Sequence, residues 1–262
     1  MQSDDHAVVQ EMLNKVPEVT LYFWIIKIVA TTVGETAADL LSIKLNLGLT
    51  ITSYVMGTLL LVAMLIQLRS RKYIPSIYWI AVVLISIVGT LITDNLVDNF
   101  GVPLWITAVA FAIALSVTFA AWYASERTLS IHSIHTTMRE LFYWAAILFT
   151  FALGTAAGDL LAEDMKLGYV YSALLFGGAI AFVTLMYYVF KLNAVLAFWI
   201  AYILTRPLGA SFGDLLSQPT SSNGLGLGTV TTSAIFLVII LSLVIFMTRV
   251  QASDLRLSKT KD

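Results

Sequence analysis

The sequence contains no cysteine and only five prolines, and it carries few charges for a chain of 262 residues. Without cysteine, disulfide frameworks, thiolate metal sites and cysteine nucleophiles are all excluded. Charged residues make up 12% of the chain, about half the share in an ordinary soluble domain. The 15 basic and 16 acidic residues nearly cancel. We therefore expect no nucleic-acid partner, because a nucleic-acid-binding face needs an excess of basic residues.

Apolar residues account for 59% of the chain, against roughly 45 to 50% in soluble domains. Apolar runs long enough to cross about 30 Å of hydrocarbon predict eight membrane spans. The runs do not alternate with period two, so we expect helices rather than barrel strands, and a polytopic all-α membrane protein in contact with the lipid bilayer. The predicted spans are residues 19–41, 48–68, 75–97, 102–123, 140–162, 168–190, 194–216 and 229–249.

Lysine and arginine predict the orientation of these spans. With a cytoplasmic N-terminus, eleven basic residues fall on the cytoplasmic side and only Lys44 and Lys166 on the other. Basic residues near span ends are retained in the cytoplasm, so we expect both termini there. Asp4, Asp5 and Glu11 precede the first span, which argues for a retained helix rather than a cleaved signal peptide. The eleven basic residues are Lys15, Arg69, Arg71, Lys72, Arg127, Arg139, Lys191, Arg249, Arg256, Lys259 and Lys261.

Four of the six tryptophans begin the same pattern: an aromatic residue, Trp, nine residues, Gly, four residues, Asp, one residue and Leu. Four matches at both spacings indicate internal duplication. We expect one membrane domain made of repeats at approximately 19–74, 75–123, 140–193 and 194–250, with a cytoplasmic linker at 124–139 and a cytoplasmic tail at 251–262. The four copies are Phe23, Trp24, Gly34, Asp39, Leu41; Tyr78, Trp79, Gly89, Asp94, Leu96; Tyr143, Trp144, Gly154, Asp159, Leu161; and Phe198, Trp199, Gly209, Asp214, Leu216.

The repeats are expected to be parallel. Each one contains two spans, so every copy enters the membrane from the same side and the copies are related by an axis along the membrane normal. The fifteen residues from Trp to Asp cover about 22 Å of helix. We interpret the aromatic–Trp pairs as an interfacial belt near the cytoplasm and the glycines as packing points. The four aspartates would then either gather near the outer mouth of a central path and line a shared site, or end their helices at the wet interface and bind water.

This repeat pattern resembles a bacterial membrane-protein family of unknown function in which four tandem repeats each carry two transmembrane helices and a characteristic tryptophan. The resemblance covers residues from about 20 to 250. Its best-preserved segment runs from Lys27 to Asp39 and reads KIVATTVGETAAD. The resemblance implies a bacterial inner-membrane protein and points towards metal or ion transport, but it brings no established reaction.

Lys27, Glu35 and Arg206 are charges within predicted spans. Such a charge costs at least about 2.5 kcal/mol on insertion scales and marks either a transport pathway or a buried pair. Two interpretations stay open: a binding site, or a structural pair that joins Lys27 or Arg206 to Glu35 or to a motif aspartate. The other repeats do not share these charges, which favours an asymmetric transporter cavity over a symmetric channel. The corresponding residues are Val82, Ile147 and Tyr202 for Lys27, and Thr90, Thr155 and Ala210 for Glu35.

Carboxylates and hydroxyls without cysteine or intramembrane histidine form a hard oxygen environment, which suits magnesium, calcium or manganese. We expect a secondary transporter that exports such a cation, for example manganese, in exchange for protons. Two alternatives remain: a carrier for a small anion that uses Arg206 and Lys27, and a non-transporting scaffold or sensor. No cofactor is expected, and the lack of a nucleophile near a base argues against an enzyme. The predicted metal ligands are Glu35, Asp39, Asp94, Asp159 and Asp214, and the predicted substrate or charge-balancing residues are Lys27, Thr31, Thr32 and Arg206.

Overall fold

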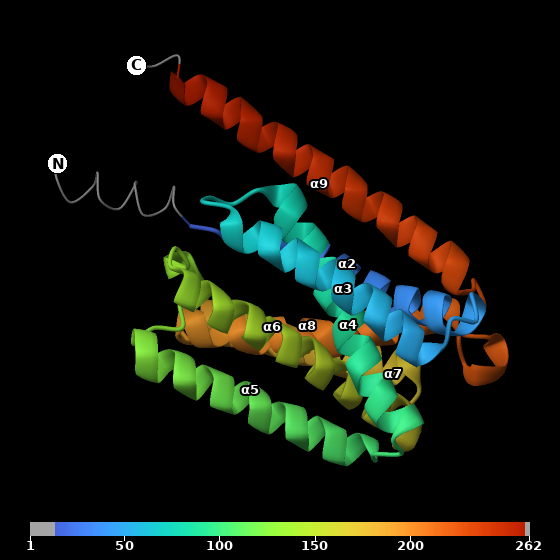
Figure 1. Ribbon diagram of the computed structural model, residues 1–262. Coiled ribbons are helices and arrows are strands. Elements are labelled where there is room, and N and C mark those ends of the chain that lie inside the picture. Colours follow the sequence, from blue (N-terminus) through green and yellow to red (C-terminus); the bar gives the residue numbers. More distant parts are fainter. Residues whose placement is uncertain (1–13, 260–262) are drawn as a thin grey trace.

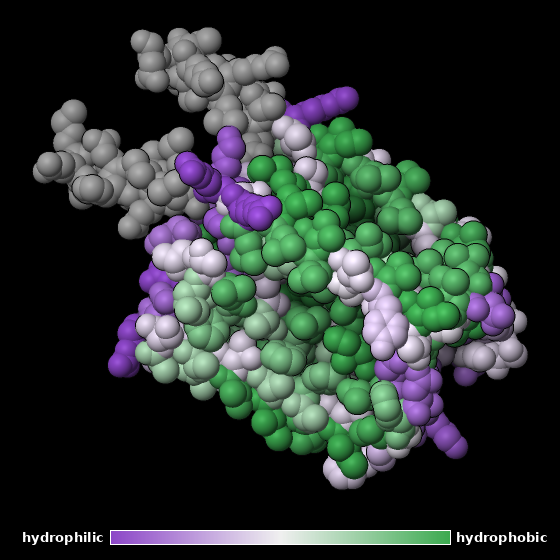
Figure 2. Space-filling model, viewed as in Figure 1, coloured by the Kyte–Doolittle hydropathy of each residue, from purple (hydrophilic) through white to green (hydrophobic). Residues whose placement is uncertain are grey.

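The computed structural model describes residues 14–259, with side chains for residues 14–250. This part of the chain holds eight helices that are long and apolar enough to cross a membrane, and no strand. Apolar side chains form a broad belt between two hydrophilic ends (Figure 2). The prediction of an all-α, multi-pass membrane protein is therefore confirmed. The helices are α2 (Leu21–Asp39), α3 (Gly48–Arg69), α4 (Pro75–Asp94), α5 (Leu104–Glu126), α6 (Thr137–Asp159), α7 (Tyr169–Tyr188), α8 (Ala194–Ser217) and α9 (Thr229–Lys259).

Some of the charges used to predict orientation fall where little or nothing is described. Asp4, Asp5, Glu11 and Lys261 lie outside the described residues, and for Arg256 and Lys259 only the backbone is described.

The first helix of each repeat begins at a local signal that satisfies free backbone N–H groups. The Thr20 side chain accepts from the N–H of Phe23 before α2, and Thr136 does the same for Arg139 before α6. Asn193 caps α8 in the same way, while α4 begins at Pro75, which has no N–H to satisfy. The four Trp-bearing helices are thus defined by their own sequences.

Helices α2, α4, α6 and α8, which we call the core helices, form a closed ring. Each packs against its two neighbours in chain order, and α8 returns to pack against α2. The remaining helices, which we call peripheral, pack around this ring: α3 on α4, α5 on α6, α7 on α8 and α9 on α2. Figure 1 shows α9 and α5 on opposite sides of the bundle. Each peripheral helix thus packs mainly on the core helix of the following repeat, and the last packs on the first.

The motif glycines set the spacing of the core helices. A Cβ at any of the four would overlap a residue of the next core helix, and the contacted residue always lies three positions before that helix's own glycine. Small residues allow helices to approach this closely in a membrane, as the sequence predicted. The contacts run once around the ring: Gly34 with Ser86, Gly89 with Phe151, Gly154 with Arg206, and Gly209 with Thr31.

The aromatic residues of the motif form a second ring at the end where the core helices begin, which we call the aromatic end. The interfacial-belt interpretation is wrong for most of them: Trp79, Trp144 and Trp199 are at most 4% exposed. Each repeat's aromatic residue packs against the next repeat's Trp, because the ring closure turns both inward. The ring centroids lie 5.7 Å apart for Phe23 and Trp79, 5.4 Å for Tyr78 and Trp144, 6.2 Å for Tyr143 and Trp199, and 5.7 Å for Phe198 and Trp24.

Candidate functional site

The opposite end of the core bundle, which we call the acidic end, contains a partly open cavity of about 300 Å³. It is lined by residues from all four repeats, and its described lining includes no lysine, arginine or histidine. All five predicted metal ligands lie on its wall, so the structure brings together the carboxylates that the repeat pattern singled out. The acidic lining residues are Glu35, Asp39, Asp94, Asp98, Asp159, Glu163 and Asp214.

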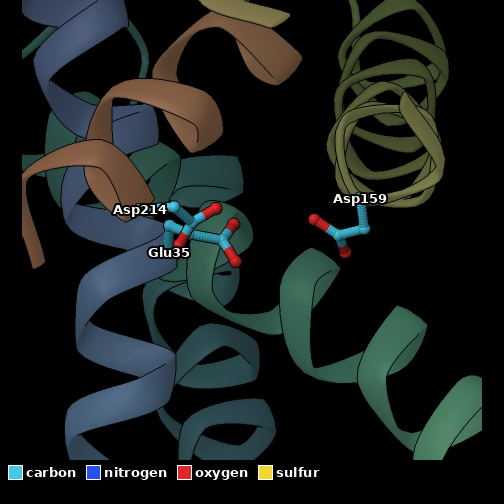
Figure 3. Close-up of side chains that lie close together, drawn as sticks. All are labelled: Glu35, Asp159 and Asp214. Atoms are coloured by element: carbon cyan, nitrogen blue, oxygen red, sulfur yellow. The ribbon is translucent and has the colours of Figure 1, made fainter. Parts of the chain in front are cut away.

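Three of these carboxylates come close enough together to share one ion. One oxygen each from Glu35, Asp159 and Asp214 lie within 4.8 Å of one another. Figure 3 shows Glu35 and Asp214 side by side, with Asp159 facing them from α6. Within the described chain, neither Asp159 nor Asp214 accepts a side-chain hydrogen bond or forms an ion pair, although Asp214 is only 7% exposed. A buried carboxylate without a partner is costly in free energy, and a bound cation would remove that cost.

The acidic lining forms tiers that become more exposed towards the rim. Glu35 is buried at the bottom, the motif aspartates lie one turn further along, and Asp98 and Glu163 are exposed at the rim. Asp98 and Glu163 were missed by the sequence analysis. Each stands four residues after its motif aspartate, so aligning the repeats beyond the motif would have found them.

Local backbone geometry places this rim tier. A π-helical turn follows the motif aspartate in three repeats, at Leu40–Lys44, Asn95–Asn99 and Leu160–Asp164. In the fourth repeat α8 instead runs on to Ser217, and Gln218 lines the cavity at the corresponding position. The Gln218 Nε2 donates to Asp39 over 3.4 Å. Single π-helical turns are rare and are often found at functional sites.

Below the cavity, Arg206 of α8 holds the carboxylate of Glu35. Its Nη2 donates to Glu35 Oε2 over 2.7 Å and to Thr155 Oγ1 over 2.6 Å, and it also donates to Thr90 Oγ1. Glu35, Thr90 and Thr155 occupy the same repeat position on α2, α4 and α6, so one guanidinium ties all four core helices together. The predicted pair between Arg206 and Glu35 is present, with side chains 0% and 8% exposed.

Lys27 lies deeper, between the Arg206 contact and the aromatic end. Its Nζ sits 3.8 Å from the centre of the Phe151 ring and 4.2 Å from that of Tyr202. It is fully buried and has no hydrogen-bond acceptor or acid within residues 14–250. Neither Lys27 nor Arg206 lines the cavity, so the anion-carrier interpretation finds none of its expected contacts there.

Thr31 and Thr32, predicted as substrate or charge-balancing residues, do not line the cavity. Both are buried where α2 meets α8, away from the cavity. The Thr32 hydroxyl reaches the Gly209 carbonyl at 3.1 Å, and the Thr31 hydroxyl donates to the Ile28 carbonyl at 2.5 Å. The close approach at Gly209 turns these hydroxyls towards backbone carbonyls, where they support packing.

The cavity offers hard oxygen donors and little else. Carboxylates dominate its polar lining, together with Ser42 and Gln218, and its apolar lining is aliphatic: Ile43, Leu49, Val97 and Leu104. The absence of aromatic side chains from this described lining argues against an organic ammonium, which aromatic faces bind well. The volume leaves room for an ion with several waters of its hydration shell. Magnesium, calcium and manganese are the cations that such a site suits.

Comparison with known proteins finds one similarity. A family model described as Repeat of Unknown Function (DUF347) matches the chain four times, at residues 22–73, 77–128, 142–193 and 197–253. No curated protein and no solved structure matches the chain.

Proposed function

Since the chain belongs to the DUF347 repeat family, whose description assigns no activity, we propose a function from its own geometry: it is a secondary transporter that exports a hard divalent cation, such as manganese, in exchange for protons. The observation that carries this proposal is the meeting of Glu35, Asp159 and Asp214 in a cavity without basic residues among its described lining. A transport role, rather than a catalytic one, suits a site between helices that cross the membrane.

We assign the role of each residue from its depth in the cavity. Glu35, Asp159 and Asp214 form the principal binding site, while Asp39 and Asp94 add ligands from the same tier. Asp98 and Glu163 at the rim attract cations and exchange them with solvent. Arg206 occupies Glu35 when no ion is bound, since it is already paired with that carboxylate. A cation that binds Glu35 repels this guanidinium, which links binding to the position of α8.

The predicted orientation of the helices indicates which state of the transport cycle the structure represents. With both termini in the bacterial cytoplasm, as the basic residues predict, the acidic end faces outward. The cavity is then open to the outside, while the buried aromatic ring closes the cytoplasmic end. This is the state in which an exporter releases its cation and takes up protons. Rocking of one group of repeats against the other around a fixed site is an established way to alternate access, also where the repeats are related by an axis along the membrane normal.

The direct test is cation binding and transport by acid variants of the purified protein. We expect Asp159→Asn and Asp214→Asn each to weaken Mn²⁺ binding at least tenfold, about 1.4 kcal/mol, in isothermal titration and to slow Mn²⁺ movement into liposomes. Asp164→Asn is the matched control, because Asp164 is an exposed acid near the same end that does not line the cavity. The Asp164→Asn variant should bind Mn²⁺ with an affinity within twofold of that of the wild-type protein.

The proposal fails if folded wild-type protein binds none of Mn²⁺, Mg²⁺ and Ca²⁺ at millimolar concentration, or if the two variants bind as the control does. A cellular measurement tests the same proposal: Glu35→Ala or Asp39→Ala should remove any manganese tolerance that the wild-type protein confers, with equal amounts of protein in the membrane.

A non-transporting scaffold is the second candidate, and the pairing of Arg206 with Glu35 favours it. A buried pair of this kind can join helices without taking any part in transport. Wild-type protein that moves no cation in liposomes, yet purifies with one constant partner, would support the scaffold role.

A further inference from the structure

Lys27 is a buried cation that the proposed binding site does not use. Two aromatic faces stabilise an ammonium at Nζ, but no carboxylate pairs with it in the described chain. The guanidinium of Arg206 lies near the same Phe151 ring, with its Cζ 5.7 Å from the ring centre. Aromatic faces stabilise a cation less than an ion pair does, so Lys27 is held in the membrane interior with incomplete compensation.

The buried charges between the cavity and the aromatic end do not balance. Arg206 and Lys27 supply two positive charges, and among residues 14–250 Glu35 is the one buried acid in contact with either. On the neighbouring core helices, Tyr202 of α8 presents its ring face to Lys27. The buried tyrosines of α4 and α6, Tyr78 and Tyr143, share a hydrogen bond between their hydroxyls. From α9, the nearest titratable group with a described side chain is Arg249, one turn beyond the Phe246 ring that meets Tyr22 at the aromatic end. An arginine stays charged in proteins, so Lys27 is the group that can change charge.

We propose that Lys27 is the proton-carrying site that couples cation export to proton uptake. This inference rests on the proposed function. When a divalent cation binds at Glu35, Asp159 and Asp214, the Lys27 ammonium loses its proton, the electron pair of the broken N–H bond stays on Nζ, and the proton passes to water on the side then open. When the cation leaves, the neutral amine takes a proton from the other side.

Electrostatics supports this exchange. Lys27 and Glu35 stand eight residues apart on α2, about 12 Å along the helix axis. The two charges of a bound divalent cation at that distance repel a proton on Lys27 Nζ. By linkage, a proton on Lys27 weakens cation binding to the same extent.

Two substitutions separate a proton carrier from a structural cation. Lys27→Met keeps the length of the side chain and removes the charge, whereas Lys27→Arg keeps the charge but cannot release a proton. In liposomes, both should lose Mn²⁺ accumulation driven by a pH gradient at least tenfold. Lys27→Met should still exchange Mn²⁺ for Mn²⁺ across the membrane. Ile147→Met is the matched control, since Ile147 occupies the same position in the third repeat and is equally buried.

Proton release gives a second measurement that requires no transport. Mn²⁺ added to weakly buffered, detergent-solubilised protein should release about one proton fewer per bound cation in both Lys27 variants than in wild type or Ile147→Met. If Lys27→Met does not fold, Lys27→Arg alone carries the test.

The outcomes distinguish this inference from the function on which it rests. Lys27→Arg that accumulates Mn²⁺ and releases protons as wild type does overturns the inference and leaves cation transport standing. A Lys27→Met variant that still accumulates Mn²⁺ under a pH gradient also overturns the inference and leaves cation transport standing. Wild-type protein that neither binds nor moves Mn²⁺ overturns the proposed function, and the inference with it.

Discussion

Arg206 and Glu35 are 171 positions apart in the chain, yet their side chains form the most buried ion pair that the structure describes. The desolvation of two charges roughly offsets their attraction, so such a pair adds little net stability. Removing only one of the two charges is strongly destabilising, because the remaining charge is left in a medium that cannot solvate it. The pair therefore constrains which substitutions the bundle tolerates.

We expect Arg206→Met to lower the free energy of unfolding by about 3 to 5 kcal/mol, because Glu35 is left buried and unpaired. The double variant Glu35→Gln with Arg206→Met should lose less than Arg206→Met alone, since neither charge remains. Denaturant unfolding in detergent micelles measures both. A double variant at least as unstable as Arg206→Met would show that the pair is not what makes the single change costly.

Among the helices, the same three contacts recur at every interface of the core ring. A motif glycine meets the following core helix, an aromatic residue meets the following Trp, and a peripheral helix covers that same neighbour. The sequence predicted the glycines as packing points. It could not show the aromatic pairs as buried, because Trp at a span end is equally typical of an interfacial position. A buried Trp is distinguished from an interfacial one only by whether another helix packs against it.

Gly89→Ala should destabilise the protein by roughly 1 to 3 kcal/mol, since the added methyl group would overlap Phe151 and approach the backbone of Ala152. Gly57→Ala on α3 is the control, because nothing lies within 4 Å of the position where its Cβ would be. That change should be neutral or should stabilise by up to about 1 kcal/mol through helix propensity. Thermal unfolding of the two purified variants compares them, and equal losses would refute the close-packing account.

For the whole molecule, closure of the ring is the property that positions the cavity. The peripheral helix of the fourth repeat packs on the core helix of the first, so α9 joins the two ends of the chain. No repeat buries its own core helix, and the cavity takes a wall from each of the four. Repeats that depend on their neighbours in this way are expected to fold together rather than singly.

A cross-link tests the closure directly, in a chain that has no cysteine of its own. The rings of Tyr22 on α2 and Phe246 on α9 lie 5.6 Å apart. Cysteines at these two positions should be joined by a short thiol-reactive cross-linker, giving a shift in gel mobility. The control pair places cysteines at Tyr22 and Tyr123, since α5 lies on the opposite side of the bundle (Figure 1). Equal cross-linking of both pairs would contradict the ring.

The sequence by itself determined the spans, the helical fold and the parallel repeats. Those depend on hydropathy and spacing along one chain, and both are read without knowing any neighbour. It also placed the motif aspartates at one end, because an even number of spans per repeat leaves no other choice.

Only the tertiary structure decided which charges meet. That Arg206 contacts Glu35 while Lys27 contacts aromatic rings depends on which core helices are adjacent and on how closely the glycines let them approach. The rim acids Asp98 and Glu163 join the cavity through π-helical turns. The contacts of Arg206 and Lys27, in contrast, join residues far apart in the chain, so no local pattern encodes them.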